Sequence, residues 1–158
     1  LTELVDGTAA DLGQVGEVIR VDTAILGTLI NAGFLPVVSP IAVEGDEVNE
    51  ISSVGLNVNA DLAAAAIAGA MHAHTLIFMT DVAGIYRNWP DPTSLISVIS
   101  AAELRTLKDD FSEGMAPKVL AALNAIDAGA SAVRVIDGKD PLAFALALRG
   151  HGGTLVSA

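Results

Sequence analysis

Short runs of aliphatic and β-branched residues alternate along the chain with longer stretches of helical periodicity. The short runs lie at residues 17–21, 35–39, 75–79, 132–136 and 154–156. Near-continuous apolar runs of this length are typical of strands buried on both faces, as in parallel sheets. They predict a mainly parallel sheet.

The stretches between these runs carry helix signals. Ser100 and Glu103 have the spacing of a capping box, and two later stretches begin with proline and end at glycine. The predicted helices cover residues 22–32, 61–71, 100–107, 117–128 and 141–148. Strands that alternate with helices predict a layered α/β fold.

Two segments interrupt this alternation. Residues 42–56 are polar and acidic, and we expect a hairpin or a loop there. Residues 86–97 contain Pro90 and Pro92 and form a second excursion from the layers. Its aromatic residues Tyr86 and Trp89 either cover a nucleobase or simply pack against the protein.

Composition narrows the classes of function. The 158 residues include 8 Lys and Arg against 19 Asp and Glu, so the net charge is −11, which disfavours a nucleic-acid-binding domain. An apolar content of 52% excludes a disordered chain. No apolar run approaches the roughly 20 residues that a membrane helix needs, so no membrane partner is expected. The absence of cysteine excludes disulfides and thiolate metal sites and suits a cytoplasmic protein.

Polar side chains cluster at the junction between residues 42–56 and the next predicted helix. Asn57, Asn59 and Asp61 lie within five residues, more than one helix cap needs. Open α/β sheets place ligands at such junctions. We therefore assign capping to Asn59 and function to Asn57 and Asp61.

A second candidate site follows the apolar run at residues 75–79. Residues 80–86 fit either an ordinary strand exit, with Gly84 supplying a turn, or a nucleotide-binding loop at the carboxyl edge of the sheet. Lys118 lies in the first turn of a predicted helix, just after Gly114. A cation there opposes the helix macrodipole but strengthens the attraction of a helix start for phosphate, so we favour a functional lysine. Neither a P-loop nor a GxGxxG fingerprint is present.

Together these motifs resemble the amino acid kinase family, and within it the branch whose acceptor is N-acetyl-L-glutamate. The matching motifs lie at residues 11–18, 35–41, 57–61, 80–86, 114–118, 135–138 and 153–155. The resemblance implies an incomplete carbamate kinase-like fold, a three-layer α/β/α sandwich with a mainly parallel sheet. It also implies that residues 1–60 are the remnant of the amino-acid-substrate lobe and residues 61–158 the nucleotide-binding lobe.

The resemblance further implies transfer of the γ-phosphate of ATP to the γ-carboxylate of N-acetyl-L-glutamate in arginine biosynthesis. Asn57 would hold the acceptor, Lys118 would neutralise charge on the moving phosphoryl group, and Asp61 would orient the catalytic lysines. The implied nucleotide-binding residues are Asp81, Val82, Ala83, Gly84, Ile85, Tyr86, Asp110, Phe111 and Ser112. Mg²⁺ would arrive with ATP rather than at a metal site of the protein, and the full-length protein would be a homo-oligomer.

In this family a second catalytic lysine, a glycine-rich phosphate loop and a substrate arginine come from the amino-terminal half, and none precedes Leu1. We therefore expect the chain to represent the carboxyl-terminal part of such a kinase, with little or no kinase activity alone. The alternatives are a non-catalytic nucleotide-binding module of the same fold, or a sister kinase acting on glutamate or an aminoadipate derivative.

Overall fold

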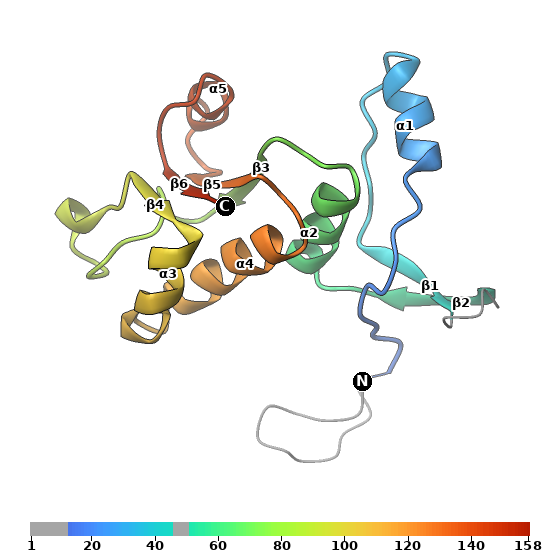
Figure 1. Cartoon of the computed structure of the whole chain (residues 1–158), viewed down its shortest axis with the longest axis horizontal. Coiled ribbons are helices and arrows are strands. Elements are labelled where there is room, and N and C mark those ends of the chain that lie inside the picture. The colour runs from blue at the N-terminus through green and yellow to red at the C-terminus, as the bar shows by residue number, and fades with distance from the viewer. Residues whose placement is uncertain (1–12, 46–50) are drawn as a thin grey trace. The chain divides into compact units, whose positions relative to one another are not determined.

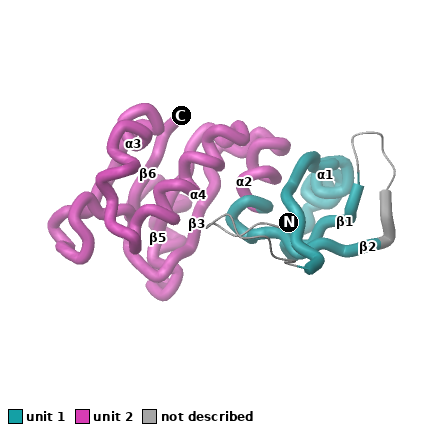
Figure 2. The backbone as a smooth tube through the Cα atoms, turned by 90° about the horizontal axis from the view of Figure 1, so that it is seen from below, with its two compact units in different colours: residues 1–63 teal, residues 64–158 magenta. Residues whose placement is uncertain are grey.

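A computed structural model describes residues 13–45 and 51–158. Residues 11 and 12 of the first matching motif, and residues 46–50 of the acidic excursion, lie outside the described residues. The chain divides into two compact units, residues 1–63 and residues 64–158, which are coloured separately in Figure 2. Which unit serves the acceptor and which the nucleotide stays a prediction.

Unit 1 is built from a helix and a hairpin. Helix α1 covers Ala24–Asn31, and strands β1 (Ile41–Gly45) and β2 (Ile51–Asn57) pair antiparallel. The structure thus confirms a helix within residues 22–32 and resolves the choice over residues 42–56 in favour of a hairpin. Gly33, which follows α1, has a φ of +84°, the left-handed conformation that ends many helices.

The first two predicted strands are wrong. Residues 17–21 and 35–39 belong to no helix or strand. An apolar β-branched run becomes a strand only where a neighbouring strand satisfies its backbone and covers its side chains. Leu35 and Val37 instead remain 89% and 94% exposed.

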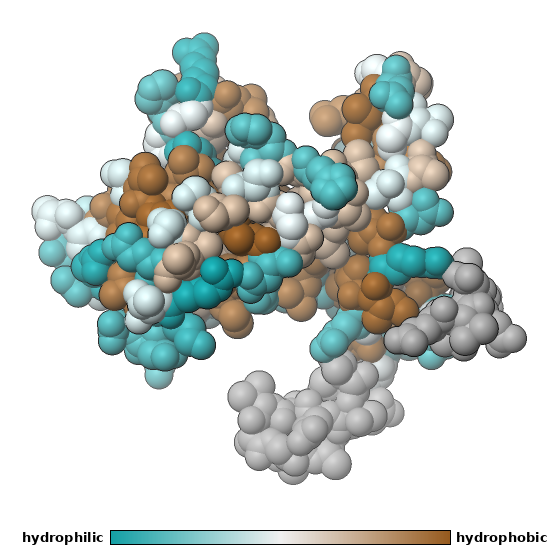
Figure 3. Space-filling view, in the orientation of Figure 1, coloured by the Kyte–Doolittle hydropathy of each residue, from teal (hydrophilic) through white to brown (hydrophobic). Residues whose placement is uncertain are grey.

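Unit 1 carries much of the exposed apolar surface of the described chain, and Figure 3 shows apolar residues gathered at the surface. The large apolar residues of this unit that are about half exposed or more are Ile19, Ile25, Ile30, Phe34, Leu35, Val37, Val38, Ile41 and Val43. None of the residues of α1 is buried. Unit 1 therefore has little core of its own.

Unit 2 contains a four-stranded sheet in the order β3-β5-β6-β4. Strands β3 (Leu76–Thr80), β5 (Ala132–Asp137) and β6 (Thr154–Ser157) confirm the remaining three predicted strands. β4 (Val98–Ser100) was not predicted. The β3–β5 and β4–β6 pairs are parallel and only the β5–β6 pair is antiparallel, so the sheet is mainly parallel as predicted.

Four α-helices accompany this sheet. α2 (Ala60–Ala70) begins in unit 1 and continues into unit 2, and it is followed along the chain by α3 (Ala101–Leu107), α4 (Ala116–Asp127) and α5 (Ala143–Leu148). Two short 3₁₀ turns cover Pro92–Ser94 and Lys108–Asp110. All four helices were predicted. The capping box is half confirmed, since the Ser100 side chain accepts a hydrogen bond from the Glu103 amide at 3.1 Å.

The helices cover both faces of the sheet. Figure 1 shows α3 and α4 on one side of the strands and α5 on the other, which confirms the α/β/α arrangement. The core lies between α3, α4 and the central strands, and Leu104, Val119, Val133 and Val156 are at most 1% exposed. β5 is buried at its four central positions, as a near-continuous apolar run predicts. Within the described ranges, no helix combines the length and hydropathy needed to cross a bilayer.

Candidate functional site

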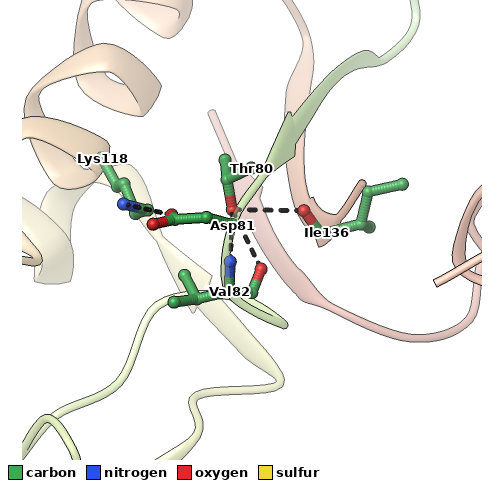
Figure 4. A network of polar contacts seen from close by, with 5 residues as sticks. All are labelled: Thr80, Asp81, Val82, Lys118 and Ile136. Atoms are coloured by element: carbon green, nitrogen blue, oxygen red, sulfur yellow. Dashed lines mark hydrogen bonds and ion pairs between the residues drawn. The ribbon is translucent and has the colours of Figure 1, made fainter. Parts of the chain in front are cut away.

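A lysine–aspartate pair lies at the edge of unit 2 where β3 and β5 end (Figure 4). Asp81 directly follows β3, and Lys118 belongs to the first turn of α4. The Lys118 Nζ lies 3.0 Å from the Asp81 Oδ1. The Lys118 side chain is only 20% exposed, whereas that of Asp81 is 65% exposed. The ion pair therefore joins a largely covered lysine side chain to an exposed aspartate side chain.

The electrostatics of α4 explain why Lys118 needs this partner. The first turn of α4 contains no acidic residue, and no side chain caps its start. The positive end of the helix dipole thus opposes the ammonium, and Asp81 offsets that repulsion from another element. The pKa of Asp81 is held below its usual value, first by the hydrogen bond from the Lys118 side chain. A hydrogen bond from the backbone of Asp81 and the charge of the Lys118 ammonium lower it further. The carboxylate is therefore charged at neutral pH.

The position of Asp81 is set by the residue before it. The Thr80 hydroxyl lies 2.9 Å from the Val82 carbonyl and 3.2 Å from the Ile136 carbonyl, and it accepts from the Val82 amide at 3.3 Å (Figure 4). The Gly138 amide donates to the Thr80 carbonyl at 2.8 Å. These contacts tie the end of β3 to the end of β5. The turn that carries Asp81 is consequently anchored to the sheet.

Gly84 occupies a position with no room for a side chain. A Cβ there would lie 2.5 Å from the Oγ1 of Thr154, a residue with 0% exposure. The Thr154 hydroxyl accepts from the Ile85 amide at 2.7 Å and donates to the Ile96 carbonyl at 2.6 Å. Gly84 does not have a positive φ, so close packing rather than a turn explains this glycine. The sequence analysis placed Thr154 in a matching motif and a predicted strand but gave its hydroxyl no role, because a buried threonine looks like any other strand residue.

Two aromatic residues join the loop after β3 to the turn before α4. The rings of Tyr86 and Trp89 meet edge to face with centroids 5.1 Å apart. Tyr86 is 8% exposed and Trp89 41% exposed. A Cβ built on Gly114 would lie 3.6 Å from Cδ1 of Trp89. The indole therefore lies beside the start of α4.

The second predicted nucleotide segment immediately precedes Gly114 and its neighbours. Asp110 ends the 3₁₀ turn, and the partly buried Phe111 packs against the core. The Ser112 carbonyl accepts hydrogen bonds from the amides of Met115 and Ala116 at 2.8 and 2.9 Å. The segment thus shapes the turn into α4, and its role toward a nucleotide stays a prediction.

The predicted acceptor residue Asn57 and the predicted catalytic residue Asp61 lie in unit 1. The Asn59 side chain accepts from the amides of Asp61 and Leu62 at 3.0 and 3.1 Å, which confirms Asn59 as the cap of α2. Asn57 ends β2, and its backbone bonds to Gln14 and Gly16. Asp61 lies in the first turn of α2, and both Asn57 and Asp61 are exposed. The side-chain cap of α2 is therefore supplied by Asn59 rather than by Asn57 or Asp61.

A separate open pocket of about 500 Å³ lies within the excursion between β3 and β4. It is lined by Arg87, Asn88, Asp91, Thr93, Ser94, Leu95 and Ile96. Neither Lys118 nor Asp81 contributes to it, and its cation Arg87 lies 3.8 Å from Glu103. Across residues 13–45 and 51–158, no group of three or more His, Asp or Glu residues could hold a metal ion.

Curated proteins similar to this chain are acetylglutamate kinases. That of Bifidobacterium animalis subsp. lactis (strain AD011) is 45% identical over 138 residues, which cover 87% of this chain and 44% of the relative. Those of Paenarthrobacter aurescens (strain TC1) and Streptomyces clavuligerus are each 46% identical, over 87% of this chain and 45% and 44% of the relative. The chain thus spans less than half the length of these relatives.

Solved structures show the same fold. An N-acetylglutamate synthase from Neisseria gonorrhoeae, complexed with coenzyme A and L-arginine, superposes with a TM-score of 0.78 at 23% identity, over 98% of this chain and 34% of that one. A carbamate kinase from Giardia lamblia bound to AMP-PNP gives a TM-score of 0.57 at 26% identity, over 73% of this chain and 40% of that one. The expected carbamate kinase-like fold is confirmed. The sequence profile of the amino acid kinase family matches residues 2–137, and the chain belongs to this family.

Proposed function

We propose that this chain forms the nucleotide-binding part of an ATP-dependent kinase that phosphorylates the γ-carboxylate of N-acetyl-L-glutamate. The observation that carries the proposal is the Lys118 ammonium, held 3.0 Å from Asp81 where β3 and β5 end. The curated relatives support the choice of acceptor over glutamate or an aminoadipate derivative, because they are acetylglutamate kinases at 43–46% identity. The AMP-PNP complex of the Giardia carbamate kinase supports ATP as the donor.

The proposed chemistry needs positive charge and positioning more than acid–base groups. Charge spreads over the phosphoryl oxygens during transfer, and a preorganised ammonium stabilises it. The acceptor carboxylate is already ionised, so no general base is required. Lys118 suits this role because it lies in the first turn of α4 and its ion pair with Asp81 holds its amine near the ends of β3 and β5.

Residues 81–86 and 110–112 would enclose the nucleotide, and Asn57 would hold the acceptor while Asp61 orients lysine side chains. Magnesium would arrive with ATP and would neutralise part of the phosphate charge. The described residues offer no cage of three or more acidic or histidine side chains, so phosphate oxygens and water would supply most of the ligands. Arginine biosynthesis, a cytoplasmic location and a homo-oligomeric full-length enzyme belong to the same proposal.

The nucleotide part of the proposal can be tested on the chain itself by calorimetric titration with MgATP. We expect saturable binding that Lys118→Ala weakens about 10- to 100-fold, as for the loss of a charge-assisted contact. Arg149→Ala is the matched control, since it removes one exposed cation from the end of α5. Absence of binding to the parent chain, or equal losses in both variants, would contradict the proposal.

A further inference from the structure

Trp89 lies between the two segments proposed to enclose the nucleotide. It follows residues 81–86 along the chain and contacts the ring of Tyr86, the last residue of that segment. Its indole also lies beside Gly114, two residues after the segment 110–112. Trp89 therefore links both segments without belonging to either.

Packing within the protein accounts for only part of this tryptophan. Tyr86 is almost buried, whereas 41% of Trp89 remains exposed. The contact with the Tyr86 ring and the position beside Gly114 restrict the orientation of the indole before any ligand arrives. A restricted, partly exposed aromatic surface loses little entropy when a flat ligand covers it.

The surroundings indicate which ligand that is. Gly114 lies in the turn just before α4 and Lys118 in the first turn of α4, so the indole and Lys118 lie at the same end of α4. A nucleotide whose phosphates contact Lys118 has its base at the far end of an extended molecule. Aromatic side chains stack on bases through their π-faces. A purine has two fused rings and covers more of an indole than a pyrimidine does, so its stacking buries more surface.

We propose that Trp89 stacks on the base of the bound nucleotide and favours a purine there. This inference rests on the nucleotide site proposed above and adds to it the residue that recognises the base. The competing explanation is that Trp89 only covers Gly114.

The sequence contains a single tryptophan, so the tryptophan fluorescence of the whole chain reports on Trp89 alone. We would titrate the 158-residue chain with MgATP, with MgCTP and with magnesium tripolyphosphate, which has the phosphates but no base. Stacking predicts saturable quenching by MgATP with the same midpoint as calorimetry. It predicts less quenching by MgCTP and none by tripolyphosphate, although tripolyphosphate competes with MgATP for Lys118.

The variant arm uses Trp89→Leu, with calorimetry as the readout. We expect it to weaken MgATP binding about 5- to 100-fold, the range found for lost base stacking, and to leave tripolyphosphate affinity unchanged. Trp89→Phe keeps an aromatic face and should retain part of the affinity. Phe144→Leu on α5 is the matched control, because Phe144 is 45% exposed and lies outside the proposed site.

The outcomes separate the two proposals. If MgATP binds and Lys118→Ala weakens it, but the fluorescence does not change and Trp89→Leu binds normally, base stacking is wrong and the nucleotide site stands. Equal losses of MgATP and tripolyphosphate in Trp89→Leu also overturn base stacking, because they indicate a disturbed fold. If the parent chain binds neither MgATP nor tripolyphosphate, the proposed function is wrong, and base stacking, which rests on it, is wrong as well.

Discussion

The buried hydroxyl of Thr154 offers a sharp test of how the loop after β3 is held in place. It accepts from the Ile85 amide at 2.7 Å and donates to the Ile96 carbonyl at 2.6 Å. These two backbone groups lie at opposite ends of the excursion between β3 and β4. One side chain at the start of β6 therefore closes the base of that excursion.

The magnitude follows from replacing Thr154 with valine, which keeps the shape of the side chain and removes its hydroxyl. Two buried backbone groups then lose their partner, and each such loss costs about 1–3 kcal/mol. The added methyl group returns about 1 kcal/mol by burial, so we expect a net loss of about 1–5 kcal/mol in the free energy of unfolding, with a central value of about 3 kcal/mol. Thr154→Ser keeps the hydroxyl and loses one methyl group, so it should cost about 1 kcal/mol.

Urea unfolding followed by the fluorescence of Trp89 measures these differences within unit 2. Thr93→Val is the matched control, since the exposed Thr93 hydroxyl donates to the Asp91 carboxylate at 2.7 Å. Its cost should stay below about 1 kcal/mol. The reasoning is refuted if Thr154→Val unfolds like the parent chain. It is equally refuted if the serine variant is as unstable as the valine variant, since packing would then outweigh the hydroxyl.

The remaining predictions concern charge, close packing and activity. Lys118→Ala should return the pKa of Asp81 toward its usual value in an NMR pH titration, and Lys139→Ala should change it less. Because folding lowers this pKa, the pair stabilises the fold above the unfolded-state pKa and loses that effect as the pH falls through the folded-state pKa. Gly69→Ala should destabilise the chain by about 3 kcal/mol or more in thermal melts, because its Cβ would lie 1.8 Å from a backbone oxygen. Gly27→Ala, in α1 with nothing within 4 Å, should stabilise it by about 0.5–1 kcal/mol. A coupled ADP-release assay with N-acetyl-L-glutamate should detect no turnover by the chain alone; normal turnover would contradict this expectation.

The sequence predicts unit 2 well because the apolar pattern of its strands agrees with their burial in the folded sheet. The runs at residues 75–79 and 132–136 are apolar on both sides of the strand, and helices cover both faces of the sheet. Pro117 and Gly129 mark the ends of α4 for local reasons that do not depend on tertiary contacts. β4 escaped prediction because three residues, of which only Ile99 is buried, carry too little pattern.

Unit 1 shows where this reasoning stops. Residues 17–21 and 35–39 are rich in aliphatic and β-branched residues, as the correctly predicted strands are, yet neither is a strand. Local composition alone therefore does not make a strand, because the backbone hydrogen bonds between strands must come from another segment. The sequence predicts a hairpin or a loop for the acidic residues 42–56, but it does not predict which residues of β1 and β2 pair.

The sequence predicts the part of the candidate site that depends on local signals, namely the helix start that carries Lys118. The glycine and proline before Lys118 indicate a helix start, and helix-start electrostatics indicate an unusual lysine. Its pairing with Asp81 joins residues far apart in sequence, and so does the position of Trp89 beside Gly114. Contacts of this kind depend on how strands and helices assemble, which no single segment encodes.

The two units differ in how firmly they hold the residues assigned to each substrate. Lys118, Asp81 and Trp89 lie in a unit whose own sheet and helices supply a buried core. Within the described part of unit 1, Val58 is the only buried apolar residue. Rigid placement of a functional side chain requires packing beneath it, so the described structure preorganises the nucleotide residues far better than Asn57. Of the two proposed roles, nucleotide binding is therefore the one that the core of this chain can support, and the proposed acceptor binding would require further packing around the β1–β2 hairpin.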